Sequence, residues 1–236
     1  MGASTEKNAE LIEHAKTLRN IPWCEDYEKM ISGMLFVSPP LLSVTPNLTG
    51  NRYRCLAPEL VTARHRARRL AIKYNTDFPD DATPESLESD RAAKLQEMIG
   101  SVGKGVYIEP PFFIDYGCNI SVGDGFYANF NMTILDCGFV TIGDRTMFGP
   151  NVSIYAATHE TGVQSRRDGV EYAREVIIGN DCWIGGHVTI MPGVTIGDGC
   201  TIGASSVVTR DIEAWSVAIG SPARVVKKVD PVPPLN

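Results

Sequence analysis

Residues 178–208 read IGNDCWIGGHVTIMPGVTIGDGCTIGASSVV, a stretch in which an aliphatic residue recurs at every sixth position. These aliphatic positions are Ile178, Ile184, Ile190, Ile196, Ile202 and Val208. A helix repeats its buried positions about every 3.6 residues and a half-buried strand every second residue, so neither explains a sustained period of six. A hexapeptide period is typical of a parallel β-helix, in which three hexads form one triangular coil of about 18 residues. We therefore expect the aliphatic side chains to fill the inside of a prism.

The same spacing recurs upstream with two interruptions. It holds through Val122, Ala128 and Ile134, and again through Ile142, Phe148 and Ile154. The step from Ile134 to Ile142 is eight residues, which predicts a two-residue bulge near Asp136 and Cys137. Residues 156–175 are polar and break the repeat. We expect them to form a loop thrown out from one corner of the prism, and loops on a rigid scaffold often carry chemistry.

The N-terminal part has a different organisation. Helical patterns cover residues 5–19, 27–32, 57–74 and 83–100, and the last of these has Thr83 placed as N-cap with Pro84 in the first turn. Residues 38–50 are rich in proline and glycine and predict a loop. The sequence thus predicts a helical subdomain over residues 1–100, a β-helix domain over residues 101–229 and a tail at residues 230–236.

Composition excludes several functional classes. The chain has 236 residues and a net charge of −6, which argues against a nucleic-acid backbone as partner. The arginines at positions 64, 66, 68 and 69 are therefore expected to form a solvated or subunit-contacting helix face. No apolar run approaches the roughly 18 residues of a membrane span, and residues 1–19 are polar and acidic, unlike a signal peptide. We expect a cytoplasmic protein.

Cysteines and histidines give only weak indications of chemistry. Cys182 and Cys200 stand 18 residues apart, so they should stack on neighbouring coils, and we expect two free, buried thiols. Of the four histidines, only His159 and His187 fall in the β-helix, which argues against a three-histidine zinc site of the γ-type carbonic anhydrases and against a metal. His159 stands at the start of the polar excursion.

Residues 26–229 closely resemble the maltose/galactoside O-acetyltransferases, a branch of the hexapeptide acyltransferases. The matching stretches are MISGMLF, ARHRARRLAIKYN, YIEPPFFIDYGCNISVGDGFYANFNMTILD, GPNVSIYAATH, IGNDCWIGGHVTIMPGVTIGDGCTIGASSVVTRDI and GSPARVV. The resemblance implies a left-handed parallel β-helix of hexapeptide repeats. That handedness comes from the resemblance alone, because the general rule for parallel crossovers favours right-handed ones.

The resemblance also implies an activity, acetyl-CoA-dependent acetylation of a sugar hydroxyl. His159 matches the general base of the family, Asn129 matches the residue that touches the thioester, and Asp115 and Asp136 match acceptor-pocket positions. A histidine suits this task because its usual pKa lies near 6.5. Direct transfer would need no acyl-enzyme. From the residues alone, the Asn and Asp positions read as corners and turns.

For acetyl-CoA, the resemblance implies a groove lined from the C-terminal coils. The matching positions are Gly186, Ala204, Thr209, Arg210, Arg224 and Lys227. Arg210, Arg224, Lys227 and Lys228 would supply positive charge for the phosphates of the co-substrate. The family associates as trimers, so we expect a homotrimer in which His159 of one chain faces the cofactor groove of the next.

Three departures leave the acceptor open. Some relatives carry a carboxylate at the position of Cys137, residues 1–20 extend beyond the usual start, and SPPLLSVTPNLTG intervenes where relatives place an acidic residue. The acceptor could therefore be a sugar or a non-sugar hydroxyl compound. A non-catalytic structural β-helix subunit is the alternative outside the enzymes, and release of free thiol from acetyl-CoA would separate it from an acetyltransferase.

Overall fold

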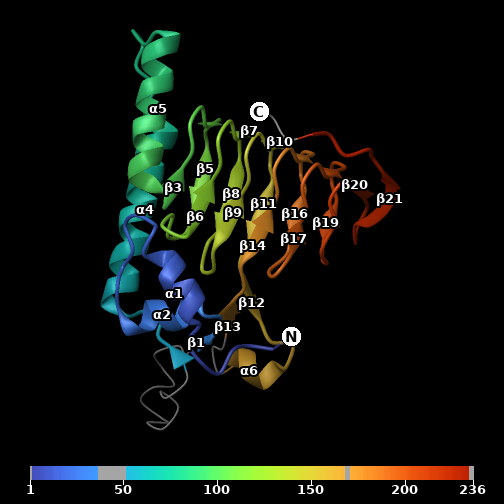
Figure 1. The fold of residues 1–236 in the computed structure, drawn as a ribbon. Helices are drawn as coiled ribbons and strands as arrows, with labels where there is room; N and C mark the ends of the chain where they lie inside the picture. The colour runs from blue at the N-terminus through green and yellow to red at the C-terminus, as the bar shows by residue number, and fades with distance from the viewer. Residues whose placement is uncertain (1, 37–51, 168–170, 234–236) are drawn as a thin grey trace.

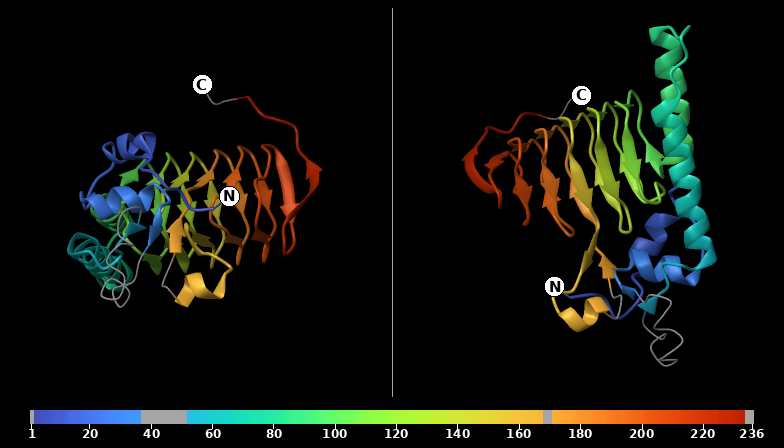
Figure 2. Two further views of the ribbon diagram at one scale, coloured as in Figure 1. Left: turned by 90° about the horizontal axis from the view of Figure 1, so that it is seen from below. Right: turned by 180° about the vertical axis from the view of Figure 1, so that it is seen from behind.

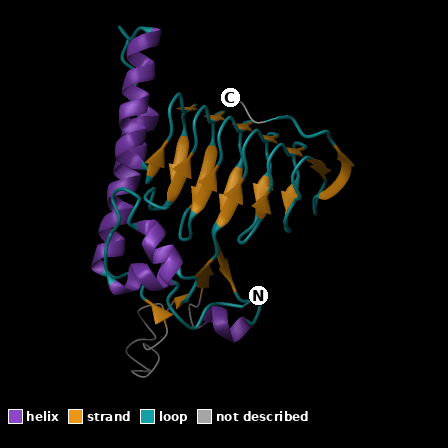
Figure 3. Cartoon of the chain, viewed as in Figure 1, coloured by secondary structure: helices purple, strands orange, loops and turns teal. Residues whose placement is uncertain are grey.

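The computed structural model describes residues 2–36, 52–167 and 171–233. A prism of short parallel strands leads away from a group of helices, and the last strands close its far end (Figure 1). The helices are α1 (Ala9–Ala15), α2 (Glu25–Ile31), α4 (Pro58–Thr76), α5 (Pro84–Met98) and α6 (Val163–Arg167). The strands of the prism lie apart from most of the helices, whereas β1 (Leu35–Phe36), β12 (Ala157–His159) and β13 (Glu171–Ala173) lie among α1, α2 and α6 (Figure 3).

Three sheets form the faces of the prism. The first face holds β3 (Ser101–Val102), β6 (Ile120–Val122), β9 (Val140–Ile142), β14 (Val176–Ile178) and β17 (Thr195–Ile196). The second face holds β4 (Tyr107–Ile108), β7 (Tyr127–Ala128), β10 (Met147–Phe148), β15 (Trp183–Ile184), β18 (Thr201–Ile202), β20 (Ser216–Ile219) and β21 (Arg224–Lys228). The third face holds β5 (Phe112–Ile114), β8 (Met132–Leu135), β11 (Ser153–Tyr155), β16 (Thr189–Ile190) and β19 (Val207–Val208).

The chain passes from the first face to the second, then to the third, and returns to the first. Each coil therefore has a first corner (first to second face), a second corner (second to third face) and a third corner (third to first face). All strand pairs within the faces are parallel except the closing pair of β20 and β21. The left-handed β-helix with a helical N-terminal part, as expected from the sequence, is confirmed as the fold class.

The aliphatic hexad positions fill the prism as predicted. The six side chains from Ile178 to Val208 are at most 1% exposed and belong to one continuous core. Strand register shows the expected coil length, because Trp183 pairs with Thr201, 18 residues on. Cys182 and Cys200, which precede these residues, are both buried and free, as predicted.

Earlier coils are two residues longer, and the extra residues stand at the third corner. Ile120 pairs with Val140, a step of 20 residues, and Ile114 pairs with Ile134, again a step of 20. The bulge expected near Asp136 and Cys137 is therefore present, and the preceding coil carries the same excess between Ile114 and Val122. Enlarged turns are thus stacked at one corner of the prism.

The polar excursion leaves the prism at this same third corner. We expected a loop over residues 156–175. The described part instead contains an antiparallel pair, β12 (Ala157–His159) and β13 (Glu171–Ala173), and α6 lies between these two strands in the sequence. This strand pair was not predicted, because short strand pairs of this kind carry no periodic signal. The excursion projects below the prism toward α1, α2 and the N-terminus (Figures 1 and 2).

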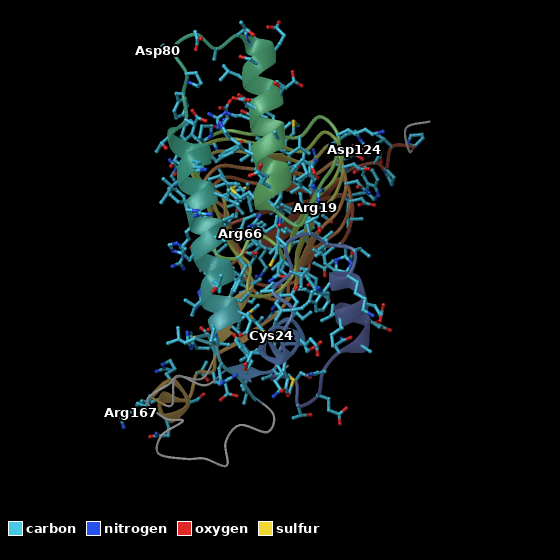
Figure 4. The ribbon with its side chains drawn as sticks, turned by 90° about the vertical axis from the view of Figure 1, so that its left-hand side faces the viewer. Arg19, Cys24, Arg66, Asp80, Asp124 and Arg167 are labelled. Carbon is cyan, nitrogen blue, oxygen red and sulfur yellow. The ribbon has the colours of Figure 1, made fainter. Side chains whose placement is uncertain are left out.

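Helices α4 and α5 lie side by side across the first coil (Figure 4). The Thr83 side chain caps α5 together with Ser86 in a capping box, and Pro84 is the first helical residue, as predicted. Helix α1 is shorter than the predicted segment, since Asn8 caps it by accepting from two main-chain N–H groups. The predicted loop at residues 38–50 lies outside the described residues.

Helices α1 and α2 pack over the third corner. The ring of His14 meets Phe139 edge-on with centroids 4.9 Å apart, and Tyr27 Oη donates to Asn119 Oδ1 at 2.8 Å. A second core forms here, where β1 (Leu35–Phe36) and β2 (Arg52–Tyr53) also lie. Its buried members include Tyr27, Tyr53, Leu60, Tyr116 and Phe139. The third corner is therefore the junction between the N-terminal helices and the prism.

Candidate active site

His159 ends β12 and faces Glu171, the first residue of β13. The two residues are register partners, and Nε2 of His159 lies 3.5 Å from Oε2 of Glu171. The histidine side chain is 52% exposed, whereas that of Glu171 is 24% exposed. An imidazole held this way is open on one side to an incoming group and supported on the other by a carboxylate.

Glu171 stands in a partly desolvated, charged environment. Burial raises the pKa of its carboxyl, the nearby His159 opposes the rise, Asp115 adds to it, and Arg64 lowers it again. These couplings place the two acidic side chains, His159 and Arg64 within electrostatic reach of one another. The excursion and the third-corner turn therefore contribute to a single polar site.

Asp115 begins the third-corner turn of the first coil, between β5 and β6. Its Oδ1 accepts from Nη2 of Arg68 at 2.7 Å, and the Cys137 thiol donates to Oδ2 at 3.7 Å. The side chain of Asp115 is 15% exposed. Cys137, singled out as a departure from some relatives, thus touches a residue expected in the acceptor pocket.

Two arginines of α4 face this turn, so the basic run is not only a solvated helix face. A subunit contact through this run stays a prediction. Arg64 donates to the hydroxyl of Tyr116 and, through Nη2, to the Cys55 carbonyl at 2.7 Å. Arg68, one helical turn further on, binds Asp115. Positions four residues apart share a helix face, which explains why both reach the same corner.

Asp136 lies beneath the same turn. It is fully buried, and its carboxylate accepts main-chain N–H groups of Asp115 at 3.1 Å, Tyr116 at 2.9 Å and Asn119 at 3.3 Å. Burial raises the pKa of Asp136 to about 7, although those hydrogen bonds oppose the rise. This geometry makes Asp136 a support for the turn. A direct contact between Asp136 and an acceptor stays a prediction.

Asn129, Gly186 and Ala204 stand at the second corner. Gly186 and Ala204 are on neighbouring coils, and the coil of β10 lies between those of Asn129 and Gly186. Asn129 Oδ1 accepts the N–H of Phe130 at 2.8 Å. The corner is tightly stacked: a Cβ on Gly185 would lie 2.6 Å from the nitrogen of Ala204. The second corner therefore offers main-chain atoms and small side chains along its length.

The predicted cationic residues lie toward the C-terminal end. Thr209 and Arg210 follow β19 at the third corner and are exposed, and Arg224 and Lys227 are exposed on β21. Lys228 pairs with Glu213 at 2.8 Å. Within one chain, His159 and Asn129 belong to different corners, so a single prism does not bring all the predicted site residues together.

Sequence reasoning missed Glu171, Arg64 and Arg68. Glu171 had no signal because its pairing with His159 depends on an excursion without periodicity. The only signal for the arginines was their spacing of four residues on a helix. Among residues 2–36, 52–167 and 171–233, no group of three His, Cys, Asp or Glu side chains is arranged to hold a metal ion. The same residues contain no helix with the length and apolarity to cross a membrane.

Comparison with family models gives two matches. Residues 175–210 match the bacterial transferase hexapeptide model of six repeats. Residues 48–103 match the maltose acetyltransferase hexapeptide capping motif. The second match includes α4 and α5, which lie across the first coil.

Individual proteins extend the similarity over most of the chain. The galactoside O-acetyltransferase of Escherichia coli K12 is 39% identical over 77% of this chain and 86% of that protein. The crystal structure of a maltose O-acetyltransferase from Clostridium difficile 630 covers 88% of this chain and 99% of that chain, with 38% identity and a TM-score of 0.75. The structure of a galactoside acetyltransferase in complex with coenzyme A covers 75% of this chain and 86% of that chain, with 39% identity and a TM-score of 0.70.

Proposed function

Because this chain belongs to the maltose/galactoside O-acetyltransferase family of hexapeptide-repeat proteins, we propose that it transfers the acetyl group of acetyl-CoA to a sugar hydroxyl. The observation that carries the proposal is the pair of His159 and Glu171, held at the third corner beside Asp115. A half-exposed imidazole supported by a carboxylate is the arrangement that a general base requires.

In this mechanism His159 removes the proton of the acceptor hydroxyl while its oxygen attacks the thioester carbonyl. A new C–O bond forms, the C–S bond breaks, and the proton passes from the imidazole to the departing thiolate of coenzyme A. Glu171 lies 3.5 Å from the ring and stabilises the imidazolium that exists between these two proton transfers. No cysteine is needed as a nucleophile.

Acetyl-CoA as co-substrate is supported by the relatives solved with coenzyme A or acetyl-CoA. We assign its pantetheine arm to the second corner, beside Asn129, Gly186 and Ala204, where exposed main-chain and small side-chain atoms follow one another from coil to coil. Arg210, Arg224 and Lys227, with Thr209 beside them, are exposed near the C-terminal end and fit the phosphates.

The distribution of these residues over two corners supports a site shared between copies of the chain. His159 and Asp115 stand at the third corner and Asn129 at the second. We therefore propose a homotrimer in which the third corner of one copy faces the second corner of the next, so that the base meets the thioester across the interface.

Release of coenzyme A thiol tests the function. The protein is mixed with acetyl-CoA and, separately, glucose, maltose, galactosides, other glycosides and a non-sugar alcohol. We expect thiol release well above the hydrolysis rate with at least one sugar. Thiol release with the non-sugar alcohol alone would show that the acceptor is not a sugar. Thiol release with none of the acceptors would overturn the proposed enzyme in favour of a non-catalytic subunit.

A further inference from the structure

An ion pair joins α4 to the third-corner turn. Arg68 Nη2 lies 2.7 Å from Asp115 Oδ1, across 47 residues of sequence. A surface ion pair of this kind usually contributes little to stability, with a typical value of about 0–1 kcal/mol. Stability alone therefore does not explain why this ion pair lies beside the candidate site.

The carboxylate of the pair is held in a fixed orientation. Below it, Asp136 accepts the main-chain N–H groups of Asp115 and Tyr116. Beside it, Arg64 donates to the Tyr116 hydroxyl, and its guanidinium carbon lies 5.2 Å from the centre of that ring. Tyr116 is itself buried, so the turn cannot move without disturbing a packed core.

Both members of the pair retain unused hydrogen-bonding capacity. Within the described part of the chain, the Arg68 side chain donates only to Asp115, and it is 64% exposed. A guanidinium has five N–H donors, and a carboxylate has about four acceptor sites. Among the residues that the structure describes, Oδ2 of Asp115 receives only the Cys137 thiol at 3.7 Å, a weak donor that a hydroxyl could displace.

The pair also lies on the reacting side of the site. The charge of Asp115 contributes to the raised pKa of Glu171, the partner of His159. Arg64, which shares a helix face with Arg68, acts on the same carboxyl. An acceptor bound at the pair would therefore lie within electrostatic reach of Glu171, the partner of His159.

From this geometry, and resting on the proposed function, we propose that Arg68 and Asp115 together bind two adjacent hydroxyls of the acceptor and make Arg68 a specificity-determining residue. The substrate class is then a vicinal diol, such as a pyranoside, rather than a simple alcohol.

A vicinal diol matches what the pair presents. Each hydroxyl both donates and accepts, so one can donate to Oδ2 of Asp115 while its neighbour accepts from a free N–H of Arg68. Hydrogen bonds to charged groups are the strong ones in proteins. An acceptor that lacks one of the two hydroxyls leaves a charged partner unsatisfied, and sites built this way discriminate strongly against it.

The experiment compares each acceptor with deoxy analogues that lack one hydroxyl of a vicinal pair. Wild type, Arg68→Gln, Arg68→Lys and Asp115→Asn are assayed for kcat/KM, and Arg69→Gln is the matched control. Arg69 is the next residue of α4, exposed, and has no ion pair among the described residues. In wild type we expect a preference of roughly 10- to 100-fold for the intact diol. In Arg68→Gln this preference should fall to within about threefold of unity.

Further readouts separate binding from a structural role. KM for acetyl-CoA should be unchanged in Arg68→Gln, because the pair is assigned to the acceptor, and Arg68→Lys should recover part of the preference. Arg69→Gln should behave as wild type. If Arg68→Gln discriminates against every deoxy analogue as wild type does, the pair is only structural and the inference is wrong.

Ligand-observed NMR with the same glycosides distinguishes this result from a failure of the proposed function. Glycoside binding that depends on Arg68 without any thiol release would overturn the acetyl transfer and leave the diol site standing. Thiol release that ignores Arg68, with glycoside binding equal in wild type and Arg68→Gln, would overturn the diol site and leave the acetyl transfer standing.

Discussion

His159 and Glu171 are twelve residues apart in sequence and directly opposite one another in the antiparallel pair of β12 and β13. The excursion returns on itself, so both residues project from one small ladder, with Nε2 and Oε2 3.5 Å apart. The rest of the prism contains only one other antiparallel pair among its described strands, at the C-terminal end. The coils thus provide a rigid base, and the excursion presents the proposed catalytic pair.

Replacing His159 with alanine should lower kcat by roughly 10² to 10⁴, the usual contribution of a positioned general base. Binding of acetyl-CoA, measured by calorimetry, should change little, because His159 is assigned to proton transfer. His65→Ala is the control, since His65 is an exposed residue on α4. Loss of acetyl-CoA binding in the His159 variant would show that the residue is a ligand contact instead.

Asp136 should make stability depend on pH. Its folded-state pKa of about 7 lies above the ordinary value of 3.8, so between these values the folded protein binds the extra proton. Stability from this group is therefore greatest below pH 3.8 and is lost as the pH rises toward 7.

The Asp136→Asn variant cannot titrate at this position. We expect the free energy of unfolding of wild type, minus that of the variant, to be larger at pH 5 than at pH 8 by about 2–3 kcal/mol. Urea unfolding at the two pH values, at one fixed protein concentration, measures it. An equal difference at both values would mean that Asp136 is ionised throughout.

Gly199 and Gly105 form a matched pair for testing how closely the coils stack. Both have positive φ, +64° and +62°, but a Cβ on Gly199 would lie 2.2 Å from Cε3 of Trp215, whereas one on Gly105 would meet nothing within 4 Å. Gly105→Ala should cost about 1–2 kcal/mol of backbone strain. Gly199→Ala should cost roughly 1–3 kcal/mol more, from overpacking. Similar losses in urea unfolding would show that Trp215 moves aside freely.

Assembly should bury an apolar row on the second face. Tyr107, Tyr127, Met147 and Trp183 are successive register partners, and the last two are 51% and 52% exposed. Burying such side chains is favourable at about 25 cal/mol per Å². Sedimentation at micromolar concentration should give about three times the chain mass of 25.7 kDa. A monomer mass would contradict the shared site. The Trp183→Asp variant should sediment as smaller species than the wild-type trimer.

The period of six was sufficient to predict the prism, its aliphatic interior and the stacking of Cys182 on Cys200, because each depends only on position within a coil. It also located the bulge at Asp136 and Cys137. The direction in which individual side chains point was harder to predict. At an enlarged turn the alternation of inward and outward side chains is broken, so nothing in the sequence indicated that the carboxylate of Asp136 points inward under Asp115.

Contacts between distant segments could not be predicted either. The pairing of Arg68 with Asp115 joins a helix to a turn 47 residues away, and it depends on where α4 crosses the first coil. The basic run on α4 resembled a solvated face because the sequence does not show the groups that Arg64, Arg66 and Arg68 bind. The partition of site residues between the second and third corners became visible only from the strand register.

Because its coils stack in fixed register, the prism has a length that can change only in whole steps of about 4.8 Å. Residues 179–196 are one such step, since Ile177 and Ile178 pair with Thr195 and Ile196. Their deletion would join Ile178 to Gly197 with every hexad still in phase, and it would bring the closing pair of β20 and β21 one step nearer to the excursion. The prism therefore acts as a molecular ruler: its number of coils sets the distance between His159 and the residues proposed to bind the phosphates, and so the length of ligand that can span it.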